Sequence, residues 1–156
     1  MDINYLHIFL SHIPAIATAV VLVLLIIGIS LKSEVFIRVS LWILVITGGI
    51  ILILYFSGEP AASNLKSLYP DLDDKYIEAH ESISLIVFVL LLVTAVYSLL
   101  GLIVYKESNN TTLLYKYVLL VIVFISVLFS VWSVYKGLQI RHPELRIEQI
   151  DTKTDL

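Results

Sequence analysis

The chain has 156 residues, of which 59% are hydrophobic and 15% are charged, and its formal net charge is −3. Soluble domains usually carry about 25% charged residues, so this composition indicates a protein that folds in a lipid bilayer. The negative net charge argues against a nucleic-acid partner, and the complete lack of cysteine excludes disulfides and thiolate metal ligands.

Four uncharged apolar segments predict four membrane-spanning helices. They cover residues 15–31, 39–56, 85–105 and 117–135. A helix needs roughly 20 apolar residues to cross the hydrocarbon layer, or about 17 at the short end. Inside lipid each backbone N–H and C=O group must be bonded within its own segment, so these segments are expected to be helical. With neutral flanking residues added, the predicted helices span about 5–31, 35–57, 75–105 and 112–138.

The connections between these helices predict the topology. The first and third connections, at 32–38 and 106–116, are short, which favours antiparallel neighbours. The polar stretch between the second and third apolar segments, from 57 to about 81, is long and contains Pro60 and Pro70. Asp74 is expected to cap the third helix. The sequence therefore predicts an all-α integral membrane four-helix up-down bundle, with one domain over 1–150 and a flexible tail at 151–156.

The distribution of basic residues predicts the orientation. Four spans place both termini and the second connection on one side of the membrane. The first predicted helix has no Lys or Arg before it and is followed by Lys32 and Arg38. Basic residues that flank the first helix usually stay on the cytoplasmic side. Both termini are therefore expected on the outer face.

Three helices carry stripes of small and hydroxyl residues at intervals of three or four. The stripes are His7, Ser11, Pro14 and Thr18; then His80, Ser84, Val87, Leu91, Thr94, Ser98 and Gly101; and finally Ser126, Ser130, Ser133 and Gly137. Such residues are enriched where membrane helices pack closely. The stripes are therefore expected to be packing seams, two of which end in a histidine at the outer side.

Histidines and carboxylates gather at the outer ends of the predicted helices. All four histidines lie beyond the apolar segments on that side, and such residues are common ligands of Zn, Fe or Mn. The predicted metal ligands are His7, His12, Glu59, His80, Glu81, His142 and Glu144, with Arg141 as a supporting cofactor contact. His80 is the strongest candidate; His12 and His142 are expected to bind with it, and His7 to act from farther away.

Two other hypotheses fit the same residues. Two histidines from different helices could be the axial ligands of a b-type haem in an electron-transfer protein. In that case Ala15 and Ala19, on the face of His12, would give the ring room. Alternatively, the polar face belongs to a non-catalytic membrane subunit or assembly factor that docks a membrane or exported protein. The sequence does not choose between a transition metal in redox service, haem and docking, and it leaves open whether the protein is an enzyme.

Several short motifs in order resemble a widespread family of four-helix bacterial inner-membrane proteins without an established activity. They are Leu6-His7 with His12 and Pro14, Gly58-Glu59-Pro60-Ala61, His80-Glu81, and Gly137 followed by Ile140-Arg141-His142-Pro143-Glu144. The resemblance implies a four-helix bundle in a bacterial inner membrane, where the outer termini predicted from the basic residues would be periplasmic. It also implies that the seven predicted metal ligands act as a unit. Lys136 stands where the family often has a second glycine.

Overall fold

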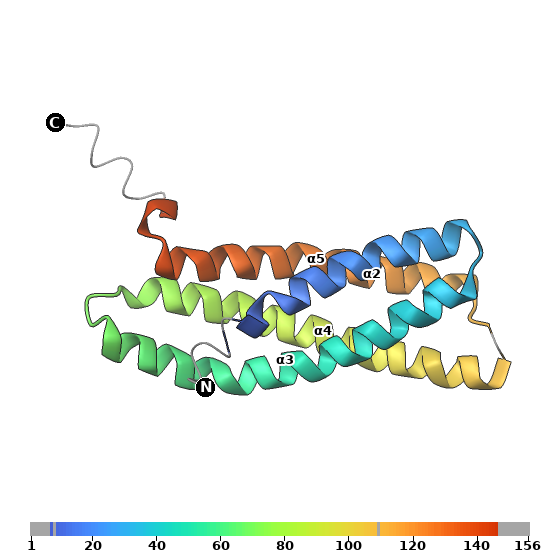
Figure 1. Cartoon of the computed structure of the whole chain (residues 1–156), viewed down its shortest axis with the longest axis horizontal. Helices are drawn as coiled ribbons and strands as arrows, with labels where there is room; N and C mark the ends of the chain where they lie inside the picture. Colours follow the sequence, from blue (N-terminus) through green and yellow to red (C-terminus); the bar gives the residue numbers. More distant parts are fainter. Residues whose placement is uncertain (1–6, 8, 109, 147–156) are drawn as a thin grey trace.

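A computed structural model describes residues 7, 9–108 and 110–146, and it is an all-α four-helix bundle, as the sequence predicts (Figure 1). The helices are α2 (Ile13–Ser30), α3 (Glu34–Leu68), α4 (Asp74–Ser108) and α5 (Leu113–Arg141), followed by the short 3₁₀ helix η1 (Pro143–Leu145). The main contacts join α2 with α3, α3 with α4, α4 with α5, and α5 with α2, so the helices form a closed ring. The predicted tail at 151–156 lies outside the described residues.

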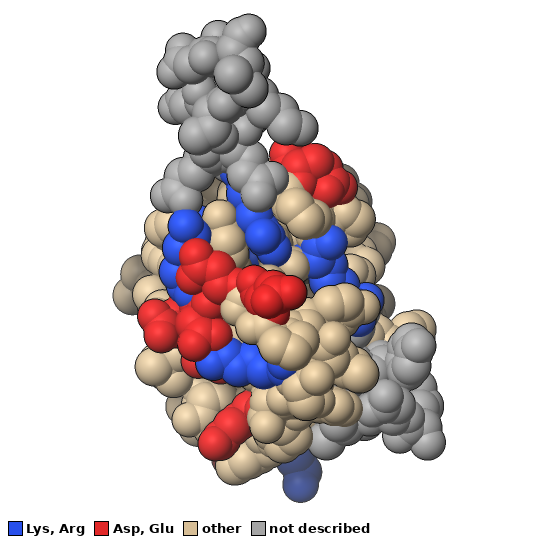
Figure 2. Space-filling model, turned by 90° about the vertical axis from the view of Figure 1, so that its left-hand side faces the viewer, with Lys and Arg blue, Asp and Glu red and all other residues tan. Residues whose placement is uncertain are grey.

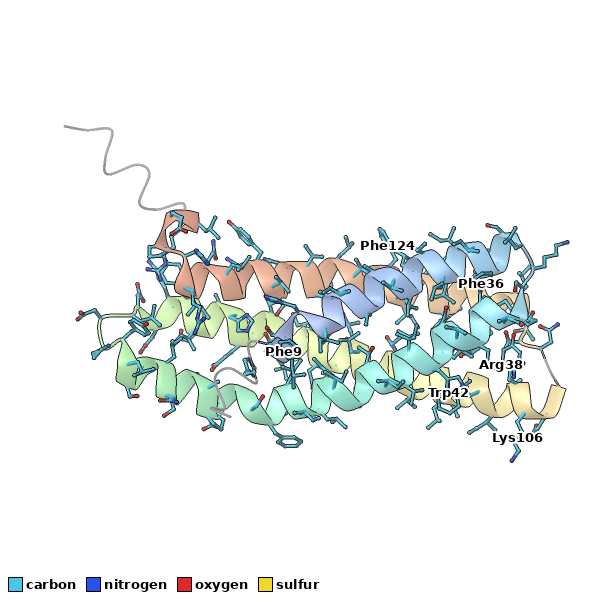
Figure 3. The ribbon with its side chains drawn as sticks, viewed as in Figure 1. Phe9, Phe36, Arg38, Trp42, Lys106 and Phe124 are labelled. Atoms are coloured by element: carbon cyan, nitrogen blue, oxygen red, sulfur yellow. The ribbon has the colours of Figure 1, made fainter. Side chains whose placement is uncertain are left out.

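The four helices are long and apolar enough to cross a membrane. The apolar stretch of the first one begins at Phe9 and continues through α2. Large hydrophobic side chains point outward along the bundle, and Trp42, for example, is 54% exposed (Figure 3). Outward apolar side chains are costly in water and favourable in lipid, so this surface suits a membrane protein.

Two helices extend well beyond the length that a bilayer requires. α3 and α4 have 35 residues each, which corresponds to about 52 Å against a hydrocarbon core of about 30 Å. The predicted end of the second helix near residue 57 is wrong, because α3 continues through Pro60 to Leu68. Proline removes one backbone hydrogen bond and usually kinks or breaks a helix, but good helix formers such as Ala61 and Ala62 follow it at once. The predicted long connection is thus mostly helical, and only residues 69–73 join α3 to α4.

The start of α4 is capped by Asp73 and not by the expected Asp74. Asp73 Oδ1 accepts a hydrogen bond of 3.0 Å from the backbone N–H of Lys75, and this bond is the main reason why the pKa of Asp73 is lowered. Asp74 instead pairs with Lys66 at 2.6 Å. An exposed ion pair of this kind contributes little stability, but it ties the end of α3 to the start of α4.

The predicted small-residue stripes are packing seams, as expected. On α4, Thr94 and Ser98 are fully buried, and their hydroxyls donate to backbone carbonyls one turn earlier in the same helix. These two hydroxyl groups thus have hydrogen-bond partners in their own helix and need none on another helix. Gly48 of α3 faces Ala95 of α4 so closely that a Cβ at Gly48 would lie 2.3 Å from the Ala95 Cβ. The small side chains therefore serve close helix approach.

An ion pair fastens the first and third connections together at the other end of the bundle. Lys116, at the start of α5, donates to a carboxylate oxygen of Glu34 at the start of α3 and to Asn110 Oδ1 at 3.3 Å. The Tyr105 hydroxyl donates to the Glu34 carbonyl at 3.3 Å. Arg38 and Lys106 lie at this same end (Figure 3).

Candidate cofactor site

One cavity of about 1100 Å³ lies at the end where α3, α4 and α5 extend past the start of α2. Figure 2 looks onto this end of the molecule, where acidic and basic side chains are gathered. Seven of the eight residues that the sequence singles out line the cavity: His7, His12, Glu59, His80, Glu81, Arg141 and His142. Glu144 is not among the lining residues and instead contacts His142.

His80 of α4 is oriented by α5. Its Nδ1 lies 3.1 Å from the backbone carbonyl oxygen of Ser133. A carbonyl oxygen can only accept a hydrogen bond, so Nδ1 carries the proton and Nε2 of the neutral ring is an acceptor. Nε2 lies 3.4 Å from the hydroxyl of Ser84, which also contacts the Ser133 hydroxyl at 2.9 Å. His80 is thus held in one tautomer with its basic nitrogen unprotonated.

His7 reaches the same cavity from the segment before α2. Its Nδ1 lies 2.9 Å from the hydroxyl of Ser57 on α3. That hydroxyl also donates to the Leu54 carbonyl at 3.1 Å, and in this arrangement it accepts a hydrogen bond from His7 Nδ1. His7 Nε2 is therefore also an acceptor. Burial lowers the pKa of His7, and the neighbouring His80 lowers it further, so the neutral ring is favoured.

A glycine lies against each of these two histidines. A Cβ on Gly137 of α5 would lie 3.2 Å from Cε1 and 3.3 Å from Nδ1 of His80, which is tighter than ordinary contact. A Cβ on Gly58 of α3 would lie 3.7 Å from Cε1 of His7, an ordinary contact distance. A side chain at position 137 would therefore force a small shift of His80 or α5, whereas His7 has room for one at position 58.

The cavity wall contains a polar group without a partner. Ser130 is 3% exposed, and its hydroxyl makes no hydrogen bond within the described part of the chain. By contrast, the hydroxyls of Thr18, Thr94, Ser98 and Ser126 donate to carbonyls of their own helix. A buried polar atom with no partner costs about 1–3 kcal/mol, so an occupant or water in the cavity that bonds to Ser130 would be favoured.

The remaining predicted residues form the rim of the cavity. His12, Glu59, Glu81, Arg141 and His142 are exposed. The His142 Nδ1 lies 2.8 Å from a carboxylate oxygen of Glu144, and both side chains are at least half exposed. Across residues 7, 9–108 and 110–146, no three His, Asp or Glu side chains come together in a group that could hold a metal ion. The structure thus separates two inward histidines from an exposed charged rim.

Sequence reasoning missed the groups that orient the two histidines. Ser57, whose hydroxyl holds His7, directly precedes the Gly58-Glu59 motif but carries no motif signal of its own. The Ser133 carbonyl is a backbone group, so no residue type identifies it. Ser84 did carry a signal, because it follows His80 by four residues and so shares its helix face.

Comparisons of the chain with protein-family models, with curated proteins and with solved structures found no match. The family resemblance of its motifs therefore stays a prediction, and the geometry of the cavity carries the functional argument.

Proposed function

We propose that the protein binds a b-type haem in this cavity, with His7 and His80 as axial ligands. The observation that carries the proposal is that Nδ1 of each ring contacts an oxygen atom, the Ser133 carbonyl for His80 and the Ser57 hydroxyl for His7, an arrangement that leaves each Nε2 available as a ligand. Histidines that bind metals usually donate their other nitrogen to a carbonyl or a similar acceptor. Two such histidines from different parts of a bundle satisfy the two axial positions of a haem.

The size and lining of the cavity support a cofactor. About 1100 Å³ slightly exceeds the range of about 300–1,000 Å³ that is usual for ligand and cofactor pockets. Much of the wall is apolar, with side chains such as Leu54, Val87 and Phe88, and Ala15 also lines it, as the haem hypothesis expects. Ala19 does not; it is exposed on α2. Arg141 at the rim offers a positive charge for the carboxylates that haem carries.

A bare transition metal held by the His and Glu residues is supported less well. Such a site normally takes three or four protein ligands, and the described residues bring no three candidate ligands together. Haem supplies four ring nitrogens itself, so two histidines from the protein are enough. We therefore propose haem in preference to a bare metal.

The role that follows is electron transfer at the outer face of a bacterial inner membrane. Haem iron bound by two histidines supplies a one-electron redox couple. The apolar wall limits water around it, and the exposed rim gives a redox partner access to the edge of the site. The location is supported by the motif resemblance and by Lys32 and Arg38, which favour a cytoplasmic position for the opposite end.

The test is to purify the full chain in mild detergent, add haemin and record absorption spectra with metal and haem stoichiometry. We expect one haem per chain with the spectrum of a six-coordinate low-spin iron. The variant His80→Ala should lose this spectrum, while the exposed rim variant His142→Ala should keep it. Stoichiometric zinc, iron or manganese without a haem spectrum would overturn the proposal in favour of a bare metal. A protein that takes up neither would overturn it in favour of a docking subunit.

A further inference from the structure

We infer that His80 is the permanent ligand of this site and His7 an exchangeable one, so that the reduced site binds a neutral diatomic gas in place of His7. This inference rests on the proposed haem function. It is carried by a different observation, which is the unequal anchoring of the two histidines.

His80 is anchored by rigid structure on several sides. It lies within the 35-residue helix α4, and its Nδ1–H is bonded to a backbone carbonyl of α5. Gly137 of α5 leaves no spare space beside its ring. Movement of the ring would break this hydrogen bond and the close contact with α5.

His7 lies in a segment that is held less firmly than the middle of a long helix. It precedes α2, and the helical residues 9–11 are separated from α2 by a turn at His12. His12 provides no side-chain cap for α2, and Pro14 lacks a backbone N–H in the first turn. Pro14 therefore removes one backbone hydrogen bond at this point, while the backbone N–H of Ile16 donates to the His12 carbonyl at 3.1 Å. His7 thus lies before the first turn of α2 and not inside a long helix as His80 does.

The contacts of the His7 ring are also few. In the described part of the chain the ring makes one hydrogen bond, to the Ser57 hydroxyl. Even a Cβ added at Gly58 would be only at ordinary contact distance from the ring, so this side is not tightly packed. One neutral hydrogen bond contributes only about 0.5–1.5 kcal/mol, so the ring can swing away without disturbing α3 or α4.

Replacement of His7 by a diatomic gas at the reduced haem iron needs no added oxidant or reductant. The bond between His7 Nε2 and ferrous iron breaks, and the lone pair of the diatomic takes its place. No electron or proton is transferred, because His7 leaves as the same neutral tautomer that was bound. Carbon monoxide is the suitable probe, since it binds ferrous haem and not ferric haem.

The experiment uses the haem-loaded full chain, reduced with dithionite and mixed with carbon monoxide in a stopped-flow instrument. We expect complete binding at a rate limited by departure of His7 and therefore independent of gas concentration at high gas. Ser57→Ala, which removes the tether, should raise this limiting rate about fivefold. His7→Ala should give a five-coordinate ferrous spectrum and remove the upper limit on the rate of carbon monoxide binding. The matched control Ser82→Ala, whose hydroxyl bonds only to its own helix, should leave the rate unchanged.

The outcomes separate the inference from the proposed function. Failure to take up haem overturns the proposed function and this inference with it. Haem uptake with no binding of carbon monoxide at saturating gas overturns the inference alone. An unchanged limiting rate in Ser57→Ala also overturns it, because the tether of His7 would then have no part in the exchange.

Discussion

The Nδ1 atom of His80 lies 3.1 Å from the backbone carbonyl oxygen of Ser133, and this contact links α4 to α5 beside the cavity. A backbone carbonyl inside a helix moves only with that helix. The ring is therefore oriented by the packing of two long helices and not by a flexible side chain. Fixed orientation of this kind typically changes metal affinity by about 10–100-fold when it is lost.

Gly137→Ala should disturb the ring of His80 directly. The new methyl group would lie 3.2–3.3 Å from two ring atoms, so the ring or α5 must shift by a few tenths of an ångström. We expect haem affinity to fall at least tenfold, on the scale of other orienting contacts. Titration with haemin measures this. Gly58→Ala is the matched control, since its methyl group has room beside His7, and its affinity should stay within about twofold. Equal loss in both variants would contradict the steric argument.

Gly48→Ala should destabilise the bundle, whereas Gly49→Ala should not. A Cβ at Gly48 would lie 2.3 Å from the Ala95 Cβ, but one at Gly49 meets no atom within 4 Å. Overpacking of this kind costs typically about 1–3 kcal/mol. Alanine at 49 should be neutral or slightly stabilising, because alanine favours helix over glycine by about 1 kcal/mol. Thermal unfolding in detergent, monitored by circular dichroism, compares the two variants. Equal melting temperatures for Gly48→Ala and Gly49→Ala would refute the prediction.

The helices and their packing faces could be predicted from the sequence because both depend on local patterns. An uncharged apolar run must be helical in lipid, and a stripe of small residues must face another helix. Thr94 and Ser98 on α4 are buried as this pattern requires. The end of α3 was not predictable in this way. The apolar pattern stops near residue 57, and continuation through Pro60 depends on packing and solvent contact outside the bilayer.

The site was only partly predictable for a similar reason. The depth of a residue in the membrane can be predicted from the sequence. The presence of all four histidines at one end of the bundle could therefore be predicted. Direction around a helix is uncertain near a proline, and the structure places both His7 and His12 on the wall of the cavity. His7 is the more buried of the two and contacts the Ser57 hydroxyl, whereas His12 is exposed at the rim. The tautomers depend on a hydroxyl and a carbonyl, which no motif reveals.

Removal of Lys116 should destabilise the opposite end of the bundle. Its side chain is 11% exposed and pairs with Glu34, which is 29% exposed. Lys116→Met would leave a half-buried carboxylate unpaired. Breaking a fully buried pair costs about 3–5 kcal/mol, and partial exposure reduces the expected loss to about 1–3 kcal/mol. Lys106→Met, at the same end but exposed, should change stability by less than about 0.5 kcal/mol. The double variant with Glu34→Gln should recover part of the loss; no recovery would refute the coupling.

The orientation can be tested with reporter fusions. The end formed by the first and third connections carries Lys32, Arg38 and Lys106, and Lys116 is neutralised there by Glu34. This end is expected in the cytoplasm. A reporter that is active only in the periplasm should therefore be active when fused after residue 156 and inactive when inserted in the connection at 109–112. The reverse pattern would place the cavity on the cytoplasmic side.

Acidification should destabilise the cofactor-free protein partly through His7. Burial, with a smaller effect of His80, lowers the pKa of His7 in the fold, whereas the unfolded chain keeps the ordinary value of about 6.5. Between these two pKa values the unfolded state binds more protons. The stability that depends on neutral His7 is therefore complete above about pH 6.5 and is lost as the pH falls toward the folded pKa. His7→Gln should remove this component, which is at most about 1.4 kcal/mol per pH unit. Melting temperatures between pH 7.5 and 5 measure it, with His12→Gln at the exposed rim as the control. A pH dependence that is identical in His7→Gln and the wild type would show that His7 takes up its proton equally well in the folded and unfolded chain.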